Sequence, residues 1–513
     1  MTKRLSALLV AASFCGQLLA LQPRQSVSFD SPGNPILGDG SLYTADPAPL
    51  VVNDTLYMLA GRDEAGPTTN AFIMNEWVMF EAQDIDPAGG EWILHRDVAS
   101  PSSVFAWALS GGAYASQVVQ GVDRRFYLYA SVQERNGASD AFSIGVGVSD
   151  SPSGPFVDAH PAGPIISQRV PVANNIHNID PTVLVDTDER VFLYWGSFNQ
   201  LRGVELDRDM VTIKGSPVTV SSLTGFFEAA WLAKRGDTYY MLYAGNNAGP
   251  NSPCTPTSYH ACIAYGTAPA PLGPWTFRGV VLDIVSSTTS HPGLFEMGGQ
   301  WYLTYHTADA AAGGHFRRSA AFDRLSWNDD TQPPSIRKVE RTKRPSLSQP
   351  RPPSRNVAPL AEAESANGTP IQYWTRALND ERVLENPLPP DYWCSWAAER
   401  SPRVNTLTYT WPQAVRLNGT AMAFFADQPA GSSIGVPPPA SWHVEYRDAE
   451  GTWCEVDVRS AGGYPTAVSR MPPEVSFQTV STTALRAVLI ASGSSTYGGV
   501  GVHEWLAFAP EPV

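Results

Sequence analysis

The chain has 513 residues, of which 43% are hydrophobic and 16% are charged, and its formal net charge at pH 7 is −14. This length indicates two or three domains, and a surface this acidic argues against binding to nucleic acid or to an anionic membrane through charge. The 42 glycines and 44 prolines favour many strands joined by turns over long helices.

The first 20 residues are typical of a secretory signal peptide. Lys3 and Arg4 form a basic start, an apolar run follows, and the small residue Ala20 stands near the expected cleavage site. The apolar run of about 16 residues is shorter than the ~20 that a membrane-spanning helix needs, so a transmembrane anchor is the weaker interpretation. We therefore expect residues 1–20 to be removed and the protein to be secreted into the extracellular space.

One pattern recurs five times along the following chain: a polar residue, an apolar strand, a short polar or glycine turn, and an aromatic-rich return strand. The copies open at Asp46, Ser116, Asp180, Glu228 and His291. Copies of a strand hairpin at intervals of ~40–70 residues are typical of a β-propeller, so residues 21–340 are predicted to form a propeller of five blades. The innermost strands of a propeller converge on its axis, which would place the five opening residues around one central depression.

Three of the opening residues are acids, namely Asp46, Asp180 and Glu228. An aspartate before a strand is commonly a turn or cap residue, but three acids at equivalent places in a repeat favour a site. Opposed carboxyl groups suit glycoside hydrolysis, because one gives its proton to the leaving oxygen while the other activates water or attacks the sugar. A further carboxylate nearby can raise the pKa of the acid by like-charge repulsion.

Aromatic residues near these repeats are candidate walls for stacking a sugar ring, although any one of them is more often part of a core. The candidates are Phe105, Trp107, Trp195, Phe227 and Trp231. We predict substrate contacts for Trp107, Phe227 and Trp231.

The stretches "YTADPAPLV", "NIDPTVLVDTDERVFLYWG" and "FFEAAWLAKRGDTYYMLYAG" resemble the three catalytic blocks of glycoside hydrolase family 43, and they follow each other in the family's order. The resemblance covers roughly residues 35 to 340. It implies a five-bladed propeller that hydrolyses by single displacement with inversion. It also implies that Asp46 is the general base, that Asp180 orients the acid and tunes its pKa, and that Glu228 is the general acid. Inversion would require a gap of ~6.5–9.5 Å between base and acid to admit water.

The same resemblance bears on a histidine and an arginine pair. Members of the family often have a histidine at the position of His291, on the axis near a bound calcium or sodium ion or a water cluster. His291 is therefore a candidate for a structural calcium site, with a hydrogen bond in the core as the alternative, and no cofactor is expected to be required. Arg317 and Arg318 match an arginine pair of which one often reaches the pocket, and we predict Arg317 to be that one.

The last third of the chain is predicted to form a second domain. Residues 341–357 are rich in proline and basic residues, which indicates an extended linker. Residues 358–513 alternate apolar and polar over short runs, the pattern of an antiparallel β-sandwich. The stretches "SWHVEYRDAEGTWCEV" and "GVGVHEWLAF" are similar to discoidin-like, galactose-binding-type jelly rolls. Such modules of carbohydrate-active enzymes bind polysaccharide or buttress the catalytic domain.

Cysteines and sequons also fit secretion. An even number of cysteines in a secreted chain suggests disulfides, and removal of the signal peptide would leave Cys254, Cys262, Cys394 and Cys454. Pairing of neighbours in sequence predicts the bonds Cys254–Cys262 and Cys394–Cys454. Sequons for glycosylation begin at Asn53, Asn367 and Asn418.

Within the resemblance, we expect a secreted, monomeric inverting glycosidase that removes α-L-arabinofuranosyl residues from plant cell-wall polysaccharide such as arabinoxylan or arabinan. A β-xylosidase, or an exo-acting galactanase or arabinanase of the same family, is the alternative. The alternative from another class is a propeller that binds carbohydrate without turning it over, and the three intact carboxylic acids argue against it.

Overall fold

The computed structural model describes residues 26–67, 69–137, 141–245, 253–254, 261–285, 288–342, 355–369, 373–383, 391–397, 401–427, 436–492 and 498–510. The expected signal peptide and most of the predicted linker lie outside this part of the chain. Within it the protein is built of strands, and α1 (Pro101–Val104) is its one α-helix. None of the described helices has the length and apolar character that crossing a membrane requires.

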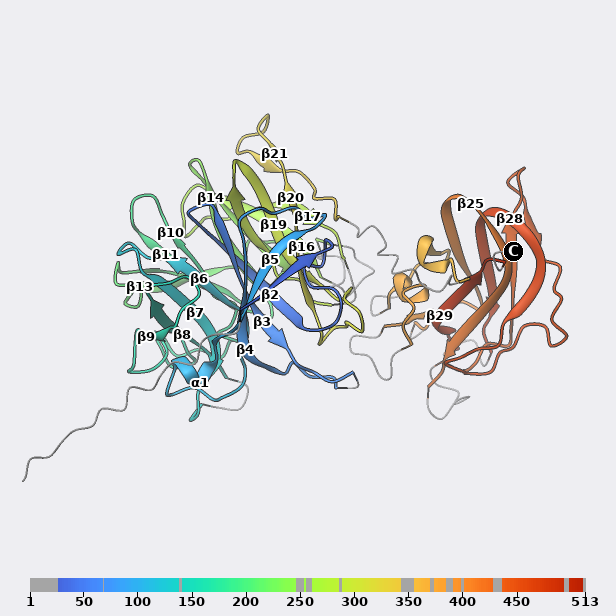
Figure 1. The fold of residues 1–513 in the computed structure, drawn as a ribbon, viewed down its shortest axis with the longest axis horizontal. Helices are drawn as coiled ribbons and strands as arrows, with labels where there is room; N and C mark the ends of the chain where they lie inside the picture. The colour runs from blue at the N-terminus through green and yellow to red at the C-terminus, as the bar shows by residue number, and fades with distance from the viewer. Residues whose placement is uncertain are drawn as a thin grey trace, which may run out of the picture.

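Five antiparallel sheets form the blades of a β-propeller, as predicted (Figure 1). The first blade holds β1 (Ser26–Ser31), β2 (Tyr43–Val52), β3 (Thr55–Asp63), β4 (Met74–Ala82) and β5 (Gly90–Ala99), with β2 at one edge and β1 at the other. The second holds β6 (Ser116–Gln120), β7 (Phe126–Gln133), β8 (Phe142–Ser149) and β9 (Val157–Asp158). The third holds β10 (Thr182–Val185), β11 (Val191–Trp195), β12 (Leu201–Leu206) and β13 (Ile213–Val220). The fourth holds β14 (Phe226–Arg235), β15 (Thr238–Gly245), β16 (Cys262–Ala268) and β17 (Thr276–Leu282). The fifth holds β18 (Gly293–Met297), β19 (Gln300–Thr307) and β20 (Ser319–Leu325), and β21 (Trp327–Asn328) pairs with β22 (Ser335–Ile336) after it.

The innermost strands form a closed ring around the axis. Strand β2 contacts β6, β6 contacts β10, β10 contacts β14, β14 contacts β18, and β18 contacts β2. Each inner strand returns through a tight turn; Asn53 and Asp54, for example, have φ of 48° and 58°, as a two-residue hairpin turn of the primed type requires. The five repeats of the sequence are thus the five inner hairpins.

The cores of the propeller lie between neighbouring blades. The residues of β7 are buried along nearly the whole strand, because both faces of that blade are covered. Between the first and last blades, Trp92 packs edge-on against Phe322 with ring centroids 5.7 Å apart. Burial on both faces explains why these strands read as apolar runs and not as a strict alternation.

The start of the chain closes the ring. The side chain of Asn34 donates from Nδ2 to the carbonyl of Phe322 (2.6 Å) and accepts from the N–H of Phe322 at Oδ1 (3.1 Å). The N–H of Ile36 donates to the carbonyl of Ala320 (2.9 Å). The segment between β1 and β2 therefore lies along β20 and joins the first blade to the last.

The C-terminal strands form a second, curved sheet with one hydrophobic core. Its elements are η1 (Ala358–Leu360), β23 (Glu362–Ser365), η2 (Thr375–Leu378), β24 (Trp393–Cys394), β25 (Val404–Phe425), β26 (Ser441–Arg447), β27 (Trp453–Glu455), β28 (Val475–Ile490) and β29 (Gly501–Phe508). The long strands β25 and β28 pair along two stretches, with a register shift between Thr410 and Val415. Tyr409, before the shift, stacks on Trp505 of β29 at 4.1 Å, so the two halves of the curved sheet enclose one core, as a β-sandwich does.

One of the two predicted disulfides is formed. Cys254 and Cys262 are bonded, whereas Cys394 and Cys454 are free thiols, so the pairing predicted for them is wrong. Cys394 lies on β24 and Cys454 on β27, which are the two ends of the strand order in the C-terminal sheet. The two cysteines are neighbours in the order of cysteines along the chain, but four other strands stand between β24 and β27 in the sheet.

Candidate active site

All three predicted carboxylic acids line one pocket at the centre of the propeller, with a volume of about 340 Å³. The walls come from the inner ends of the blades and the loops that precede them. The pocket is lined by Asp46, Phe72, Tyr114, Ala115, Phe142, His177, Ile179, Asp180, Ser197, Phe198, Glu228, Thr289, Ser290, His291 and Arg318.

Each carboxylic acid stands at a kink in its strand or strand entry. Asp46 and Asp180 have φ of 55° and 57°, and beside Glu228 it is Ala229 that has φ of 57°. The pairing register shifts between Ala45 and Ala48 in β2 and on both sides of Glu228 in β14. Such interruptions re-aim a side chain out of the regular alternation, and here they turn the acids toward the axis.

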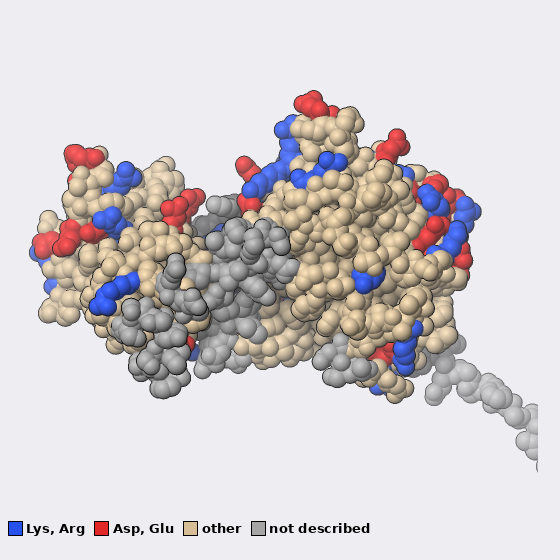
Figure 2. Space-filling view, turned by 180° about the vertical axis from the view of Figure 1, so that it is seen from behind, with Lys and Arg blue, Asp and Glu red and all other residues tan. Residues whose placement is uncertain are grey.

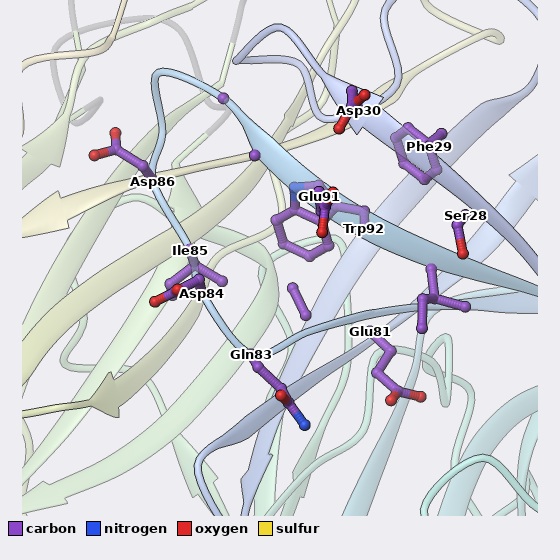
Figure 3. Close-up of a pocket in the computed structure, with 14 residues that line it drawn as sticks. Ser28, Phe29, Asp30, Glu81, Gln83, Asp84, Ile85, Asp86, Glu91 and Trp92 are labelled. Carbon is purple, nitrogen blue, oxygen red and sulfur yellow. The ribbon is translucent and has the colours of Figure 1, made fainter.

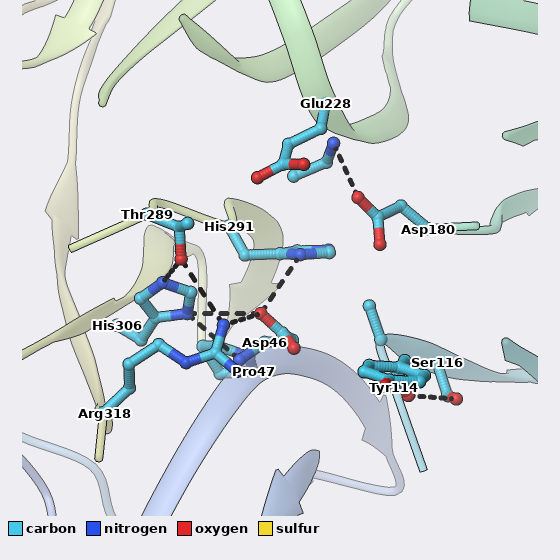
Figure 4. A network of polar contacts seen from close by, with 12 residues as sticks. Asp46, Pro47, Tyr114, Ser116, Asp180, Glu228, Thr289, His291, His306 and Arg318 are labelled. Atoms are coloured by element: carbon cyan, nitrogen blue, oxygen red, sulfur yellow. Dashed lines mark hydrogen bonds and ion pairs between the residues drawn. The ribbon is translucent and has the colours of Figure 1, made fainter. Parts of the chain in front are cut away.

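The carboxyl group of Asp46 contacts Arg318, His291 and His306 (Figure 4). Its Oδ1 lies 3.2 Å from Nη1 of Arg318 and 3.4 Å from Nδ1 of His291. Burial by itself would raise the pKa of Asp46, but the charge of Arg318 and the contact with His291 outweigh burial and hold the pKa well below its usual value. Asp46 is therefore ionised and able to accept a proton.

A second carboxylate fixes the arginine beside Asp46. Asp63, at the end of β3, accepts from Nε and Nη2 of Arg318 at 2.9 and 3.0 Å, and from its backbone N–H at 2.9 Å. Bidentate contacts of this kind fix the plane of a guanidinium group. Arg318 is thus locked in place between Asp63 and Asp46.

The backbone of Asp46 is held by a buried histidine. The N–H of Asp46 donates to Nδ1 of His306 (3.1 Å). Nδ1 of His306 also lies 3.3 Å from Oδ1 of Asp46, and its Nε2 shares a hydrogen bond with Oγ1 of Thr289 (2.9 Å). Burial, reinforced by the charge of Arg318, lowers the pKa of His306 and keeps the ring neutral.

Glu228 has the opposite character. Its carboxyl group faces the pocket and accepts from the hydroxyl of Ser197 at Oε2 (2.8 Å). Burial, with the charge of Asp180 as the next cause, raises the pKa of Glu228 to about 8. Glu228 is therefore protonated at neutral pH and able to give a proton.

Asp180 lies between the two. Its N–H donates to Oγ of Ser131 (3.0 Å), and its Oδ2 accepts from the N–H of Ala229 (3.1 Å), the residue next to Glu228. Burial raises the pKa of Asp180 to about 6; His291 opposes this shift and Asp46 adds to it. Asp180 thus touches the backbone beside the acid and places negative charge near it.

The aromatic residues predicted to contact substrate do not line the pocket. Trp231 is buried in the core, and Trp107 donates from Nε1 to Oδ2 of Asp158 (3.0 Å) while its ring packs beside Phe105. Phe227 is also absent from the lining, and its ring packs 5.1 Å from that of Phe198, which does line the pocket. These residues were predicted because large rings stand near the repeats. Side chains of the inner strands also point between the blades, however, and rings at those positions belong to the hydrophobic core.

Arg318 lines the pocket, whereas Arg317, the member of the pair that the sequence analysis predicts to reach it, does not. Nε of Arg317 donates to the carbonyl of Ala312 (2.7 Å) and Nη1 to that of Gly66 (2.9 Å). Arg317 therefore braces two loops. Neighbouring residues of a chain in extended conformation point to opposite sides, and the hydrogen bonds of Arg318 with Asp63 and Asp46 hold its side chain at the axis.

His291 lines the pocket, but its described neighbours do not make a cation site. Among the residues that the structure describes, three ligand atoms of His, Cys, Asp or Glu side chains come together at one place, formed by His443, Glu445 and Glu455 of the C-terminal sheet. Around His291 the contact is with Asp46, and that carboxylate already faces Arg318. The side chains at the axis therefore fit a hydrogen-bonded network better than the first shell of a calcium ion.

Sequence reasoning missed the groups that support the three acids. Ser197, Thr289 and His306 stand in loops and a return strand that carry no motif of their own. The rings of the pocket wall, Phe72, Phe142, His177 and Phe198, lie in segments between the repeats. Their positions depend on loop paths, which hydrophobic periodicity does not report.

A second hollow lies on the outer part of the first blade, beside β1, β5 and the turn before β5 (Figure 3). Asp30, Glu81, Asp84, Asp86 and Glu91 line it, and Asp86 pairs with Arg324 and Glu81 with His95. None of these acids stands in a network like that of Asp46 in the described structure. The central pocket is therefore the candidate active site.

A carboxyl group with a lowered pKa and another with a raised pKa, in one pocket of a β-propeller, are the pair of groups that acid–base glycoside hydrolysis uses. The family model described as glycosyl hydrolases family 43 matches residues 32–333, which is more than half of the chain. The protein belongs to this family, as the sequence resemblance implied, and it is a glycosidase.

Characterised relatives are distant and carry several names. The chain is 28% identical over 333 residues to a xylosidase/arabinosidase of Bacteroides ovatus, covering 56% of this chain and 93% of the relative. It is 26% identical over 331 residues to an arabinoxylan arabinofuranohydrolase of Bacillus subtilis, covering 56% of this chain and 61% of the relative. A solved β-xylosidase/α-arabinofuranosidase from a compost microbial metagenome, in complex with xylotriose and free of calcium, is similar with a TM-score of 0.50 at 24% identity, over 62% of this chain and 100% of that one. This structural likeness concerns the fold.

Proposed function

We propose that the protein removes α-L-arabinofuranosyl residues from plant cell-wall polysaccharide by hydrolysis with inversion. The observation that carries the proposal is one pocket in which Asp46 faces Arg318 and His291, which lowers its pKa, while Glu228 is buried near Asp180, which raises its pKa. A single displacement needs these two states at the same time, because one group must accept a proton while the other gives one.

In the proposed step, Asp46 takes a proton from a water molecule as the water oxygen bonds to the anomeric carbon. Glu228 gives its proton to the glycosidic oxygen as the bond between that oxygen and the anomeric carbon breaks. The products are a free sugar of inverted configuration and the shortened polymer. Asp180 holds the backbone beside Glu228 and keeps the pKa of the acid high until the proton is transferred.

The choice of arabinofuranose rests on the names of the relatives, which include xylosidase/arabinosidase and arabinoxylan arabinofuranohydrolase. β-Xylosidase activity is the second candidate, since a β-xylosidase of Xylanibacter ruminicola is also similar, at 28% identity. Exo-galactanase or arabinanase activity, and carbohydrate binding without turnover, are the further alternatives.

The test is a comparison of the wild-type protein with Glu228→Gln on aryl α-L-arabinofuranoside, aryl β-xyloside and arabinoxylan. We expect release of arabinose by the wild type and a loss of about 10²- to 10⁴-fold in kcat on arabinoxylan in the variant, because a general acid contributes that much. Proton NMR of the first-formed sugar should show the inverted anomer. Binding of arabinoxylan without turnover by the wild type would establish the non-catalytic alternative, and a retained anomer would refute the single displacement.

We also propose that the reaction needs no metal ion and that any calcium at the axis is structural. The contacts of Asp46 support a reaction without a metal ion, because the side chains of Arg318 and His291 already face its carboxylate. Exhaustive dialysis against EDTA should leave kcat unchanged, with the thermal unfolding midpoint as a second readout of structural calcium. A loss of kcat that calcium restores would contradict the proposal.

Secretion is supported by the disulfide Cys254–Cys262, because such bonds persist in oxidising compartments. Glycosylation remains a prediction; Asn53 is exposed at the tip of the β2–β3 turn, where a glycan has room.

The proposed partner is the polysaccharide alone, bound by a monomer, without nucleic acid or membrane. Figure 2 shows acidic and basic side chains interspersed on one face of the molecule, which fits the absence of a nucleic-acid partner.

A further inference from the structure

The rim of the pocket beside Glu228 carries an exposed aromatic ring. Phe198 follows Ser197, whose hydroxyl donates to Glu228, and it is 54% exposed. Of the large hydrophobic residues that are exposed in the described part of the chain, Phe198 alone is aromatic. A single exposed ring is ordinary on a protein surface, but Phe198 also lines the pocket and can therefore be reached by a bound ligand.

The backbone holds this ring in an unfavourable conformation. Phe198 and Asn199 have φ of 49° and 68°, a region that bulky residues rarely adopt. The turn is closed by the N–H of Asn199, which donates to the carbonyl of Phe227 (3.1 Å), and by that of Gln200, which donates to the carbonyl of Ser197 (3.1 Å). Strained positions of this kind cluster at functional sites, where the surrounding structure maintains them.

Two other rings fix the orientation of Phe198. Its centroid lies 4.8 Å from that of His177 and 5.1 Å from that of Phe227. The ring thus has two aromatic neighbours, while the residue stays 54% exposed. A rigid aromatic surface loses little conformational entropy when a ligand stacks on it.

The two sides of the pocket are chemically different, and this gives the site a direction. Asp46 and Arg318 lie on one side, where Phe72 packs 4.6 Å from the guanidinium of Arg318. Glu228 lies apart from these two residues (Figure 4), and the hydroxyl of Ser197 is bonded to it. Because the general acid protonates the departing oxygen, the departing sugar binds beside Glu228, which is where Phe198 stands.

We propose that Phe198 is the platform of the leaving-group subsite and that it stacks on a β-linked xylopyranose unit of the polymer backbone. The ring substituents of β-xylopyranose are equatorial, so both of its faces present C–H groups that pack on an aromatic ring. This inference rests on the proposed function. It names xylopyranose as the unit of the polymer to which the cleaved arabinofuranosyl residue is attached.

The test compares two substrates that carry the same cleaved sugar, one attached to a xylo-oligosaccharide and one to a methyl group. The methyl group is too small to cover an aromatic ring. We expect Phe198→Ala to lower the ratio of kcat/KM on the oligosaccharide to kcat/KM on the methyl glycoside by about tenfold, the effect of one lost ring contact. Phe198→Trp should keep the ratio within about twofold of the wild type, because the stacking surface is retained.

The matched control is Val157→Ala, which shortens an exposed apolar side chain on the outer strand β9, 60% exposed and away from the pocket. It should leave both kcat/KM values unchanged. An unaltered ratio in a folded Phe198→Ala protein, or a wild type with no preference for the oligosaccharide, would overturn the inference while leaving the hydrolase activity standing. A wild type that hydrolyses neither substrate would instead refute the proposed function, and the inference would fall with it.

Discussion

At the scale of single residues, the neighbours of each carboxyl group decide its chemistry. Asp46 and Glu228 open equivalent repeats and face the same pocket, and both are desolvated. Arg318 and His291 stand beside Asp46, whereas Glu228 has the hydroxyl of Ser197 and the negative charge of Asp180. Burial in the presence of a cation yields a base, and burial beside an anion yields an acid.

This difference predicts the pH dependence of the activity. In the proposed mechanism Glu228 acts in its protonated form, and its pKa is raised to about 8, so kcat/KM should fall as the pH rises through about 8. Asp46 must be ionised, and its pKa is held well below its usual value, so the acid limb should lie below the range of an ordinary aspartate. A pH profile of kcat/KM on a neutral glycoside measures both limits.

Two substitutions should move the alkaline limit in opposite directions. Ser197→Ala removes a hydrogen bond that favours the charged form of Glu228, so the limit should shift to higher pH. Asp180→Asn removes the negative charge that disfavours that form, so the limit should shift to lower pH. Shifts of the same sign in the two variants would show that Glu228 does not govern this limb.

At the scale of secondary-structure elements, interrupted strands aim the acids and a non-local segment closes the ring. The register shifts in β2 and β14 leave the strands paired on both sides of each kink, so the scaffold stays rigid while the acid points inward. The segment before β2 binds the edge of β20, which spares the last blade an unpaired edge. Both features are tertiary, because each depends on strands that are distant in the sequence.

The ring closure predicts a specific cost for Asn34→Ala. Asn34 is buried and makes two hydrogen bonds to the backbone of Phe322, so the substitution leaves the N–H and carbonyl of Phe322 without these partners. We expect the free energy of unfolding to fall by about 1–3 kcal/mol, as measured by urea denaturation. Asn136→Ala, at an exposed turn, is the control and should change the free energy little. Equal stabilities of the two variants would rule out a structural role for this closure.

At the scale of the whole molecule, the propeller is packed around several hydrophobic clusters between its blades, and the curved C-terminal sheet has a main hydrophobic core of its own. The covalent link found among the described residues lies within the fourth blade, between Cys254 and Cys262. The thiols of the C-terminal sheet are unpaired, since their strands stand at its two ends. The disulfide therefore constrains the propeller, whereas the C-terminal sheet is held together by the packing of its side chains.

This distribution predicts the outcome of differential alkylation. In unfolded, unreduced protein, iodoacetamide should modify Cys394 and Cys454, while Cys254 and Cys262 should react only after reduction. Peptide mass spectrometry distinguishes the four positions. If Cys394 and Cys454 did not react with iodoacetamide before reduction, they would be disulfide-bonded, as their neighbouring positions in the sequence suggest.

The sequence by itself determined the architecture and the three acids. Inner hairpins recur at regular intervals because each blade must bury both faces against its neighbours, and this demand leaves a periodic apolar pattern that can be read without coordinates. Asp46, Asp180 and Glu228 were found because they open those repeats. The order of their motifs in the chain also pointed to the family.

Only the tertiary structure decided what surrounds the acids. Arg318 rather than Arg317 reaches Asp46, Phe198 rather than Trp107 or Trp231 stands at the rim, and Cys394 does not meet Cys454. Each of these outcomes depends on the direction in which a side chain or a loop leaves its strand, and that direction is set by contacts with distant residues. Local patterns report which face of a strand is buried, but they do not report what is buried against it.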